Sequence, residues 1–117
     1  MIKVVVFGSR GFNNYSLLKT RLDYYLQNFE EEIVVVSGTA NGADLLGERY
    51  AEEHGYQIER YPANWREYGK RAGMIRNRIM AEVSDCAIGF WDGESRGTKG
   101  MIDICKELNV PLRVVNY

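Results

Sequence analysis

The sequence predicts one Rossmann-like α/β domain, a three-layer sandwich around a five-stranded parallel sheet in the order 3-2-1-4-5. Short apolar runs alternate strictly with helical patterns along the chain, which is typical of parallel strands joined by right-handed helical crossovers. Three of these runs are each followed directly by a loop of small residues that includes glycine. Such loops lie at the carboxyl edge of an open parallel sheet, where ligands bind between the first and fourth strands.

The first strand and helix are marked by a buried run and a capping residue. Residues 2–7 are continuously β-branched or aromatic, apart from Lys3, and predict a buried parallel strand. Either Asn13 or Asn14 can cap the helix that follows, because its side chain can accept from a first-turn N–H group. Apolar residues then recur at helical spacing, at Tyr15, Leu18, Leu22, Leu26 and Phe29.

The second and third strands enclose another helix. Residues 33–36 are a buried run, and the next helix begins at or near Asp44 and ends at Gly55. Residues 56–61 alternate in polarity, which predicts a partly exposed strand at the edge of the sheet. The helix has a narrow apolar stripe of Leu46, Tyr50 and Ala51.

Two helices and two strands complete the pattern. Pro62 ends the third strand, and the spacing predicts a helix over about 68–83. Residues 86–91 and 112–115 predict the fourth and fifth strands, with a helix over 98–108 between them. The inward faces of the two helices are expected to be Ala72, Ile75, Ile79 and Val83, and then Met101, Ile104, Cys105 and Leu108.

Size and composition favour an ordinary globular protein. A chain of 117 residues with 45% hydrophobic residues suits a single domain spanning residues 1–117. No apolar run is long enough to cross a bilayer, so we expect a cytoplasmic protein with no membrane partner. Cys86 and Cys105 have no neighbours at metal-ligand spacing and His54 is the single histidine, so we expect buried thiols, no metal and no cofactor.

The charge is balanced overall but uneven along the chain. A net charge of −1 makes nucleic acid an unlikely partner, whereas a homodimer fits a sheet of this size, which can leave apolar helix surface exposed. A charge run usually forms a solvated face, but a basic segment beside glycine loops also suits an anionic ligand. The basic residues of 60–80 are Arg60, Arg66, Lys70, Arg71, Arg76 and Arg78, against the single acid Glu67.

The first loop, Gly8-Ser9-Arg10-Gly11, follows the first strand. Gly8 permits a tight turn, Ser9 can donate a hydrogen bond, and Arg10 can grip a phosphate or carboxylate with two N–H groups. A plain strand-to-helix turn with a solvated arginine is the alternative. The loop matches neither the dinucleotide fingerprint nor a Walker loop.

The second loop extends from Ser37 to Asp44 and is the strongest single signal. Its glycines allow close backbone approach, and its hydroxyl, amide and free N–H groups can face an anion. Asp44 has two alternative roles, to cap the following helix or to accept hydrogen bonds from ribose hydroxyls. The candidate ligand contacts are Ser37, Gly38, Thr39, Ala40, Gly42, Ala43 and Asp44, with Asn41 beside them.

The third loop covers residues 92–100 and leads into a helix. The first N–H groups of that helix lack partners, so a phosphate there is physically natural. Asp92 and Glu94 would repel phosphate, and they bind sugar hydroxyls or a base, or face water. The candidate ligand contacts in this loop are Asp92, Gly93, Ser95, Gly97 and Thr98.

One flank of the helix over 68–83 is expected to face the same edge. Gly69, Gly73, Arg76, Asn77 and Met80 recur at helical spacing, and the two glycines keep the flank open. Arg76 beside an apolar face is costly to bury unless an anion pairs with it, and a solvated arginine is the alternative. We therefore count Gly73, Arg76 and Asn77 among the candidate ligand contacts.

These segments, taken in order, resemble a known family. The remaining motifs are Pro62-Ala63-x-Trp65, Tyr68-Gly69, Arg76-Asn77-x-x-Met80 and Phe90-Trp91-Asp92-Gly93. As a set they are similar to the SLOG superfamily, the Rossmann-like group that includes the Lonely Guy and DprA proteins, and within it to the YspA-type branch. The resemblance implies a nucleotide or nucleotide-derived ligand and a binding or sensing role.

The enzymatic relatives in that superfamily are phosphoribohydrolases, which release the base from a nucleoside monophosphate. The resemblance carries their arginine over to Arg76, but Met101 stands where they have a glutamate, and a thioether cannot assist glycosidic cleavage. Asp92, Glu94 or Asp103 would have to supply the carboxylate. The catalytic candidates are thus Arg76, Asp92 and Glu94.

Three functions follow from the sequence. The leading hypothesis is a binding or sensor module for a phosphate-bearing nucleotide derivative. The alternative is a nucleoside 5′-monophosphate phosphoribohydrolase. The third is single-stranded nucleic acid binding, supported only by the basic segment and by Trp65, which can stack on a base.

Overall fold

A computed structural model describes all residues from 1 to 117. Five parallel strands form one sheet in the order β3-β2-β1-β4-β5, which confirms the predicted fold class and strand order. The elements are β1 (Ile2–Gly8), α1 (Tyr15–Leu26), β2 (Ile33–Ser37), α2 (Ala43–His54), β3 (Gln57–Arg60), α3 (Trp65–Tyr68), the 3₁₀ turn η1 (Gly69–Arg71), α4 (Ala72–Val83), β4 (Cys86–Trp91), α5 (Arg96–Glu107) and β5 (Leu112–Asn116).

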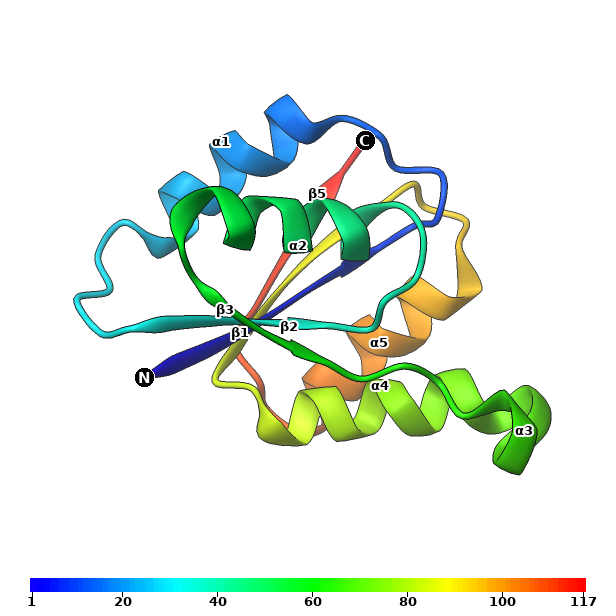
Figure 1. Ribbon diagram of the computed structural model, residues 1–117. Helices are drawn as coiled ribbons and strands as arrows, with labels where there is room; N and C mark the ends of the chain where they lie inside the picture. The colour runs from blue at the N-terminus through cyan, green and yellow to red at the C-terminus, as the bar shows by residue number, and fades with distance from the viewer.

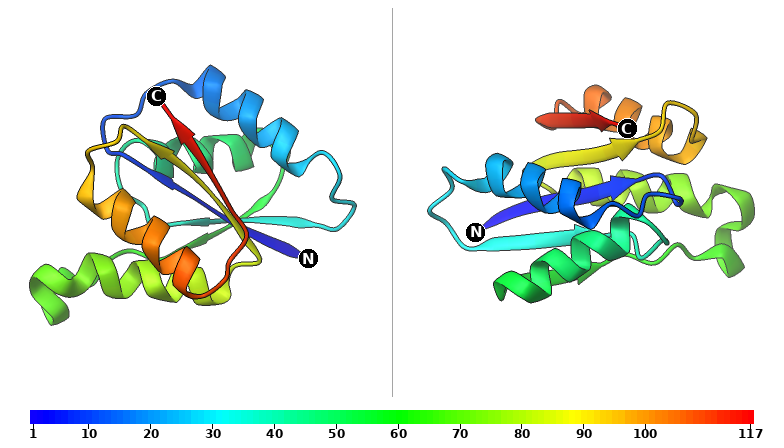
Figure 2. Two further views of the ribbon diagram at one scale, coloured as in Figure 1. Left: turned by 180° about the vertical axis from the view of Figure 1, so that it is seen from behind. Right: turned by 90° about the horizontal axis from the view of Figure 1, so that it is seen from above.

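The helices form two layers, one on each face of the sheet (Figures 1 and 2). Helices α1 and α2 cover one face, and α4 and α5 cover the other. The chain reverses its direction of winding between β1 and β4, which are paired at the centre of the sheet. The loops after β1, β2 and β4 therefore emerge together at one edge (Figure 1).

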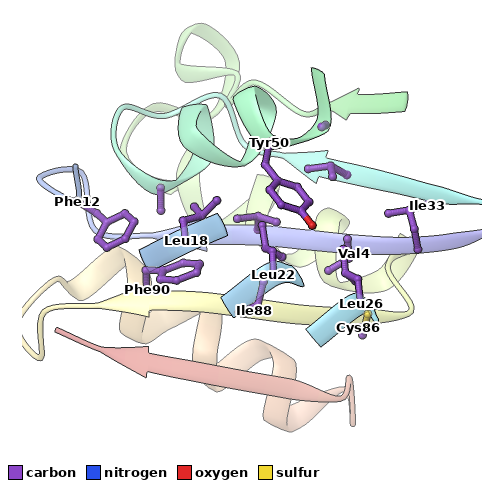
Figure 3. Packing of buried hydrophobic residues seen from close by; sticks show 14 residues of the cluster. Val4, Phe12, Leu18, Leu22, Leu26, Ile33, Tyr50, Cys86, Ile88 and Phe90 are labelled. Atoms are coloured by element: carbon purple, nitrogen blue, oxygen red, sulfur yellow. The ribbon is translucent and has the colours of Figure 1, made fainter. Parts of the chain in front are cut away.

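The core beneath α1 and α2 is packed against alternate residues of the central strands. Leu18, Leu22 and Tyr50 are almost completely buried and belong to one cluster with Val4, Ile88 and Phe90 (Figure 3). Phe12, in the loop before α1, stacks on Phe90 of β4 with ring centroids 4.9 Å apart. This contact holds the β1–α1 loop against the carboxyl end of the sheet.

The opposite face of the sheet has a core of its own. Val5 and Phe7 of β1 point into it and meet Met80 of α4 and Met101 of α5, both 1% exposed. Because the side chains of β1 alternate between the two cores, this strand joins them. Both free cysteines are buried.

The helix expected over 68–83 begins later than predicted. Its predicted first turn is replaced by α3 and η1, and α4 begins at Ala72. The side chain of Asn64 caps α3 by accepting from the Glu67 N–H at 3.1 Å, and Gly69 breaks the helix with φ 58°. A second short helix therefore precedes α4 and turns outward at the edge of the sheet (Figure 1).

The inward face predicted for that helix was also partly wrong. Ile79 is 42% exposed, whereas Asn77, Met80 and Ala81 are buried. Phe29, expected to continue the apolar stripe of α1, lies beyond the end of that helix and is 37% exposed. None of the helices combines the length and the apolar character that crossing a membrane would need.

Candidate functional site

A cavity of about 420 Å³ opens at the carboxyl edge of the sheet. All three glycine loops contribute to it, together with one flank of α4, as the sequence predicted. The lining residues are Phe7, Gly8, Ser9, Arg10, Gly11, Ala40, Asp44, Arg76, Asn77, Met80, Asp92, Ser95, Gly97, Thr98 and Met101.

A second cavity of about 410 Å³ lies beside the first. The two cavities share Arg10, Ala40 and Arg76, so these residues stand at the boundary between them. The other lining residues of the second cavity are Gly38, Thr39, Asn41, Pro62, Ala63 and Trp65. No acidic residue lines this second cavity, whereas Asp44 and Asp92 line the first.

Ser9 joins the first loop to the third. Its N–H donates to the carbonyl of Phe90 at 2.9 Å, and its hydroxyl accepts from the N–H of Asp92 at 3.3 Å. The second loop is held to the first at Gly42, which has φ 85° and lies against the carbonyl oxygens of Ser9 and Arg10. A side chain at Gly42 would collide with these backbone atoms, so close loop packing requires glycine there.

Arg76 is anchored by the backbone but has no acidic partner. Its Nε donates to Asn77 Oδ1 at 2.9 Å, and its Nη1 donates to the carbonyls of Gly38 and Tyr61. The side chain is half-buried, and burial lowers the pKa of its guanidinium, although an arginine remains charged at neutral pH. Its Nη2 group is left without a protein acceptor.

Arg10 lines both cavities together with Arg76. Neither arginine forms an ion pair with a carboxylate. The charge of Arg10 contributes to the lowered pKa of Arg76, which shows that the two cations repel each other. The Asp44 carboxylate offsets the charge of Arg76 in part, but two arginines without ion pairs at one cavity wall still favour an anion.

Asp44 is buried at the first turn of α2 and does not cap it. The N-cap residue of α2 is Gly42, which makes no side-chain cap. One carboxylate oxygen of Asp44 accepts from the N–H of Ala40 at 3.2 Å. Burial raises the pKa of Asp44 to about 6, against the opposing effects of that hydrogen bond and of the Arg76 charge. Of the two roles left open for Asp44, capping is therefore excluded.

The start of α5 forms the far wall of the first cavity. Ser95 caps α5 by accepting from the N–H of Thr98 at 3.3 Å. Asp92 Oδ1 accepts from the N–H groups of Glu94 and Ser95 at 2.9 and 2.8 Å, which lowers the pKa of Asp92. The N–H groups of the first helical turn that Ser95 does not cap have no partner within the helix, so they remain available to a ligand.

Some predicted contacts line neither cavity. Ser37 is fully buried, and its hydroxyl donates to Glu48 Oε2 at 2.6 Å and accepts from the Thr39 N–H at 3.0 Å, so it supports the loop from below. Gly42 contacts the neighbouring loop instead of open space. Ala43, Gly73, Gly93 and Glu94 also lie outside both cavities.

The second cavity itself was not predicted. Thr39, Asn41 and Gly38 were placed with the phosphate loops, but they face this neighbouring space together with Trp65. The sequence contains a motif that could have predicted this cavity. Pro62-Ala63-x-Trp65 directly follows the third strand, so it begins at the same edge of the sheet.

The sequence model of the YspA, cpYpsA-related SLOG family matches residues 2–68. The chain belongs to this family. The Gene 61 protein of Mycobacterium phage D29 is 30% identical over 123 residues, a match that covers 100% of this chain and 97% of the phage protein. The resemblance found in the loop motifs is thus confirmed.

A solved structure shares the fold of this SLOG-family chain. DNA processing protein A from Helicobacter pylori, whose structure was described for its single-stranded DNA binding mode, superposes with a TM-score of 0.69 at 23% identity. The match covers 97% of this chain but only 64% of the Helicobacter protein.

Met101 stands at the position where the resemblance to phosphoribohydrolases implied a glutamate, so the site lacks a carboxylate there. This side chain is 1% exposed and lines the first cavity with its thioether. Asp103, the nearest acid on α5, is exposed and forms an ion pair with Lys99 at 2.6 Å. It does not line the cavity, so it is excluded as a replacement.

Proposed function

We propose that this protein binds a nucleotide or nucleotide-derived ligand by its phosphate at the carboxyl edge of the sheet, as a binding or sensor module. The observation that carries the proposal is the pair of unpaired arginines, Arg10 and Arg76, at the wall of both cavities. A half-buried guanidinium without a direct ion pair is costly, because the Asp44 carboxylate offsets its charge only in part, and a bound phosphate would supply a direct counter-ion.

The other groups around the first cavity suit the rest of such a ligand. Free N–H groups at the start of α5 and the hydroxyl of Thr98 can donate hydrogen bonds to a phosphate oxygen. The carboxylates of Asp44 and Asp92 would repel a phosphate, but they are good acceptors for sugar hydroxyls. Family membership supports the same proposal, since the matched residues 2–68 include the first two loops.

Isothermal titration against a panel of nucleoside mono- and diphosphates, with the free nucleosides as controls, tests the proposal. We expect the phosphorylated compounds to bind and the free nucleosides to bind at least tenfold more weakly, because charge-assisted hydrogen bonds contribute about 1.5–3 kcal/mol each. Binding of free nucleosides alone, or of no compound, would reject the proposal.

A second candidate function is hydrolysis of a nucleoside monophosphate, and one observation favours it. Asp44 lines the cavity with a pKa of about 6, so part of it is protonated near neutral pH and can donate a proton to a leaving base. Incubation with purine and pyrimidine monophosphates would then release free base, and Asp44→Asn would abolish the release. Absence of base above a blank would exclude this function.

A third candidate is single-stranded nucleic acid binding, the property named for the Helicobacter protein. Exposed cations without ion-pair partners, Arg66, Lys70 and Arg71, lie close in sequence to the exposed Trp65. Fluorescence anisotropy with a labelled oligothymidylate would detect this binding, which must weaken as salt is added. Binding of mononucleotides without binding of the oligonucleotide would leave only the first candidate.

A further inference from the structure

The two cavities differ in chemistry on either side of the arginine pair. The first cavity has two carboxylates, Asp44 and Asp92, and no exposed aromatic ring. The second cavity has no acid and has the indole of Trp65 in its wall. The cations are the only charged groups that both cavities share. The order across the site is therefore hydroxyl acceptors, cations, aromatic ring.

Trp65 is fixed at the start of α3 and remains partly exposed. It stands at the first position of α3, whose N-cap is fixed by the Asn64 side chain. Its Cη2 lies 3.5 Å from the place where a side chain on Gly73 would begin, so the ring rests against the start of α4 without a clash. The side chain is still 53% exposed, and it lines the second cavity beside Pro62 and Ala63.

Asp92 is fixed in a corresponding way on the other side of the arginine pair. Its Oδ1 accepts from two loop N–H groups, which leaves Oδ2 free of those bonds and available to a hydroxyl. Asp44 is similarly oriented by the Ala40 N–H. These carboxylates would reject a phosphate but accept two or more sugar hydroxyls.

We propose that the ligand is two-ended: an aromatic nucleoside lies on Trp65 in the second cavity, a diphosphate bridges Arg10 and Arg76, and a second polyol fills the first cavity. This proposal rests on the proposed function and narrows it to nucleoside diphosphates that have a sugar on the far phosphate. A mononucleotide has its phosphate at one end, so it can occupy only one of the two cavities while it contacts the arginines.

Titrations with two-ended compounds and their halves test this order. ADP-ribose would be compared with AMP and ribose 5-phosphate, and UDP-glucose with UMP and glucose 1-phosphate. We expect at least one two-ended compound to bind about tenfold or more tightly than either of its halves, because the second group adds its contacts without a second loss of translational freedom. If both two-ended compounds bind no better than their halves, the proposal is wrong.

Variants on each side of the arginine pair locate the two ends. Trp65→Ala should weaken the nucleotide and the two-ended compound roughly tenfold, since base stacking on an aromatic side chain is of that size, and leave the sugar phosphate unchanged. Trp65→Phe should restore most of the affinity. Asp92→Asn should show the reverse pattern, weakening the sugar phosphate and the two-ended compound but not the nucleotide.

Tyr68→Ala is the matched control, because Tyr68 is an exposed aromatic residue of the same short helix that lines neither of the two cavities. It should leave all affinities unchanged. An equal loss with Trp65→Ala and Tyr68→Ala, or no loss with either, would overturn the two-ended arrangement while phosphate binding itself stands. If none of the six compounds binds, this inference falls, whereas the proposed function falls only if the whole nucleotide panel also fails to bind.

Discussion

Arg76 connects the fold to the ligand. Its contacts with Asn77 and with the carbonyls of Gly38 and Tyr61 fix the guanidinium, and the side chain lines both cavities. Arg76→Ala should weaken nucleotide binding by at least tenfold, since it removes a charge-assisted contact of about 1.5–3 kcal/mol. Calorimetric titration would measure the loss. The control is Arg113→Gln, because Arg113 is also an arginine without an ion pair but is exposed and lies at the opposite edge of the sheet.

The buried carboxyl group of Asp44 makes the free energy of unfolding depend on pH. Its pKa is about 6 in the folded protein against 3.8 for an ordinary aspartate, so its ionisation destabilises the folded state as pH rises through this interval. Asp44→Asn should therefore gain stability relative to the natural chain between pH 4 and pH 7, by about 3 kcal/mol at most. Urea denaturation of both proteins at the two pH values would measure the gain. A difference that does not change with pH would contradict the buried, ionisable Asp44.

At the scale of elements, the packing of the loops against one another contributes to the stability of the site. Gly42→Ala should lower the free energy of unfolding by about 1–3 kcal/mol, because φ 85° is unfavourable for alanine and its side chain would meet the carbonyls of the first loop. Chemical denaturation would measure this. Gly11→Ala is the control in the same region, since nothing lies within 4 Å of a side chain there, and equal effects of the two substitutions would contradict the account.

Local pattern was enough to predict most elements but not every boundary. Apolar runs located four strands, and alternating polarity located β3, each to within a residue or two, because a buried parallel strand needs a continuous apolar segment and an edge strand does not. The predicted start of α4 was wrong because Asn64 caps a separate short helix and Gly69, with φ 58°, interrupts it, which the spacing of apolar residues does not show. Ser37 was predicted as a ligand contact but is buried below the loop. Its bond to Glu48 depends on tertiary packing, which the loop sequence does not show.

At the scale of the molecule, the common edge of the sheet could be predicted and the chemistry within it only in part. Strict alternation fixes where the carboxyl ends of the strands lie, so the convergence of the three loops follows from topology. The boundary formed by Arg10 and Arg76 depends on how two side chains from distant segments meet. A homodimer and a cytoplasmic location stay predictions.

The chain should unfold as one cooperative unit over residues 1–117. Side chains of β1 alternate between the two cores, with Val4 and Val6 in one and Val5 and Phe7 in the other, so neither core can melt while the other keeps this strand in place. Far-ultraviolet circular dichroism and tryptophan fluorescence should therefore give coincident urea transitions. Two separate transitions would contradict a single domain.

The central claim is that the carboxyl edge of the sheet binds the phosphate of a nucleotide-derived ligand. Amide chemical shifts of the ¹⁵N-labelled protein, followed while the tightest-binding compound of the nucleotide panel is added, test it most directly. The account predicts that the largest changes occur in residues 8–11, 38–44 and 92–98. Changes concentrated at the amino edge around Ile2, Asp85 and Arg113, or no changes at saturating ligand, would contradict it.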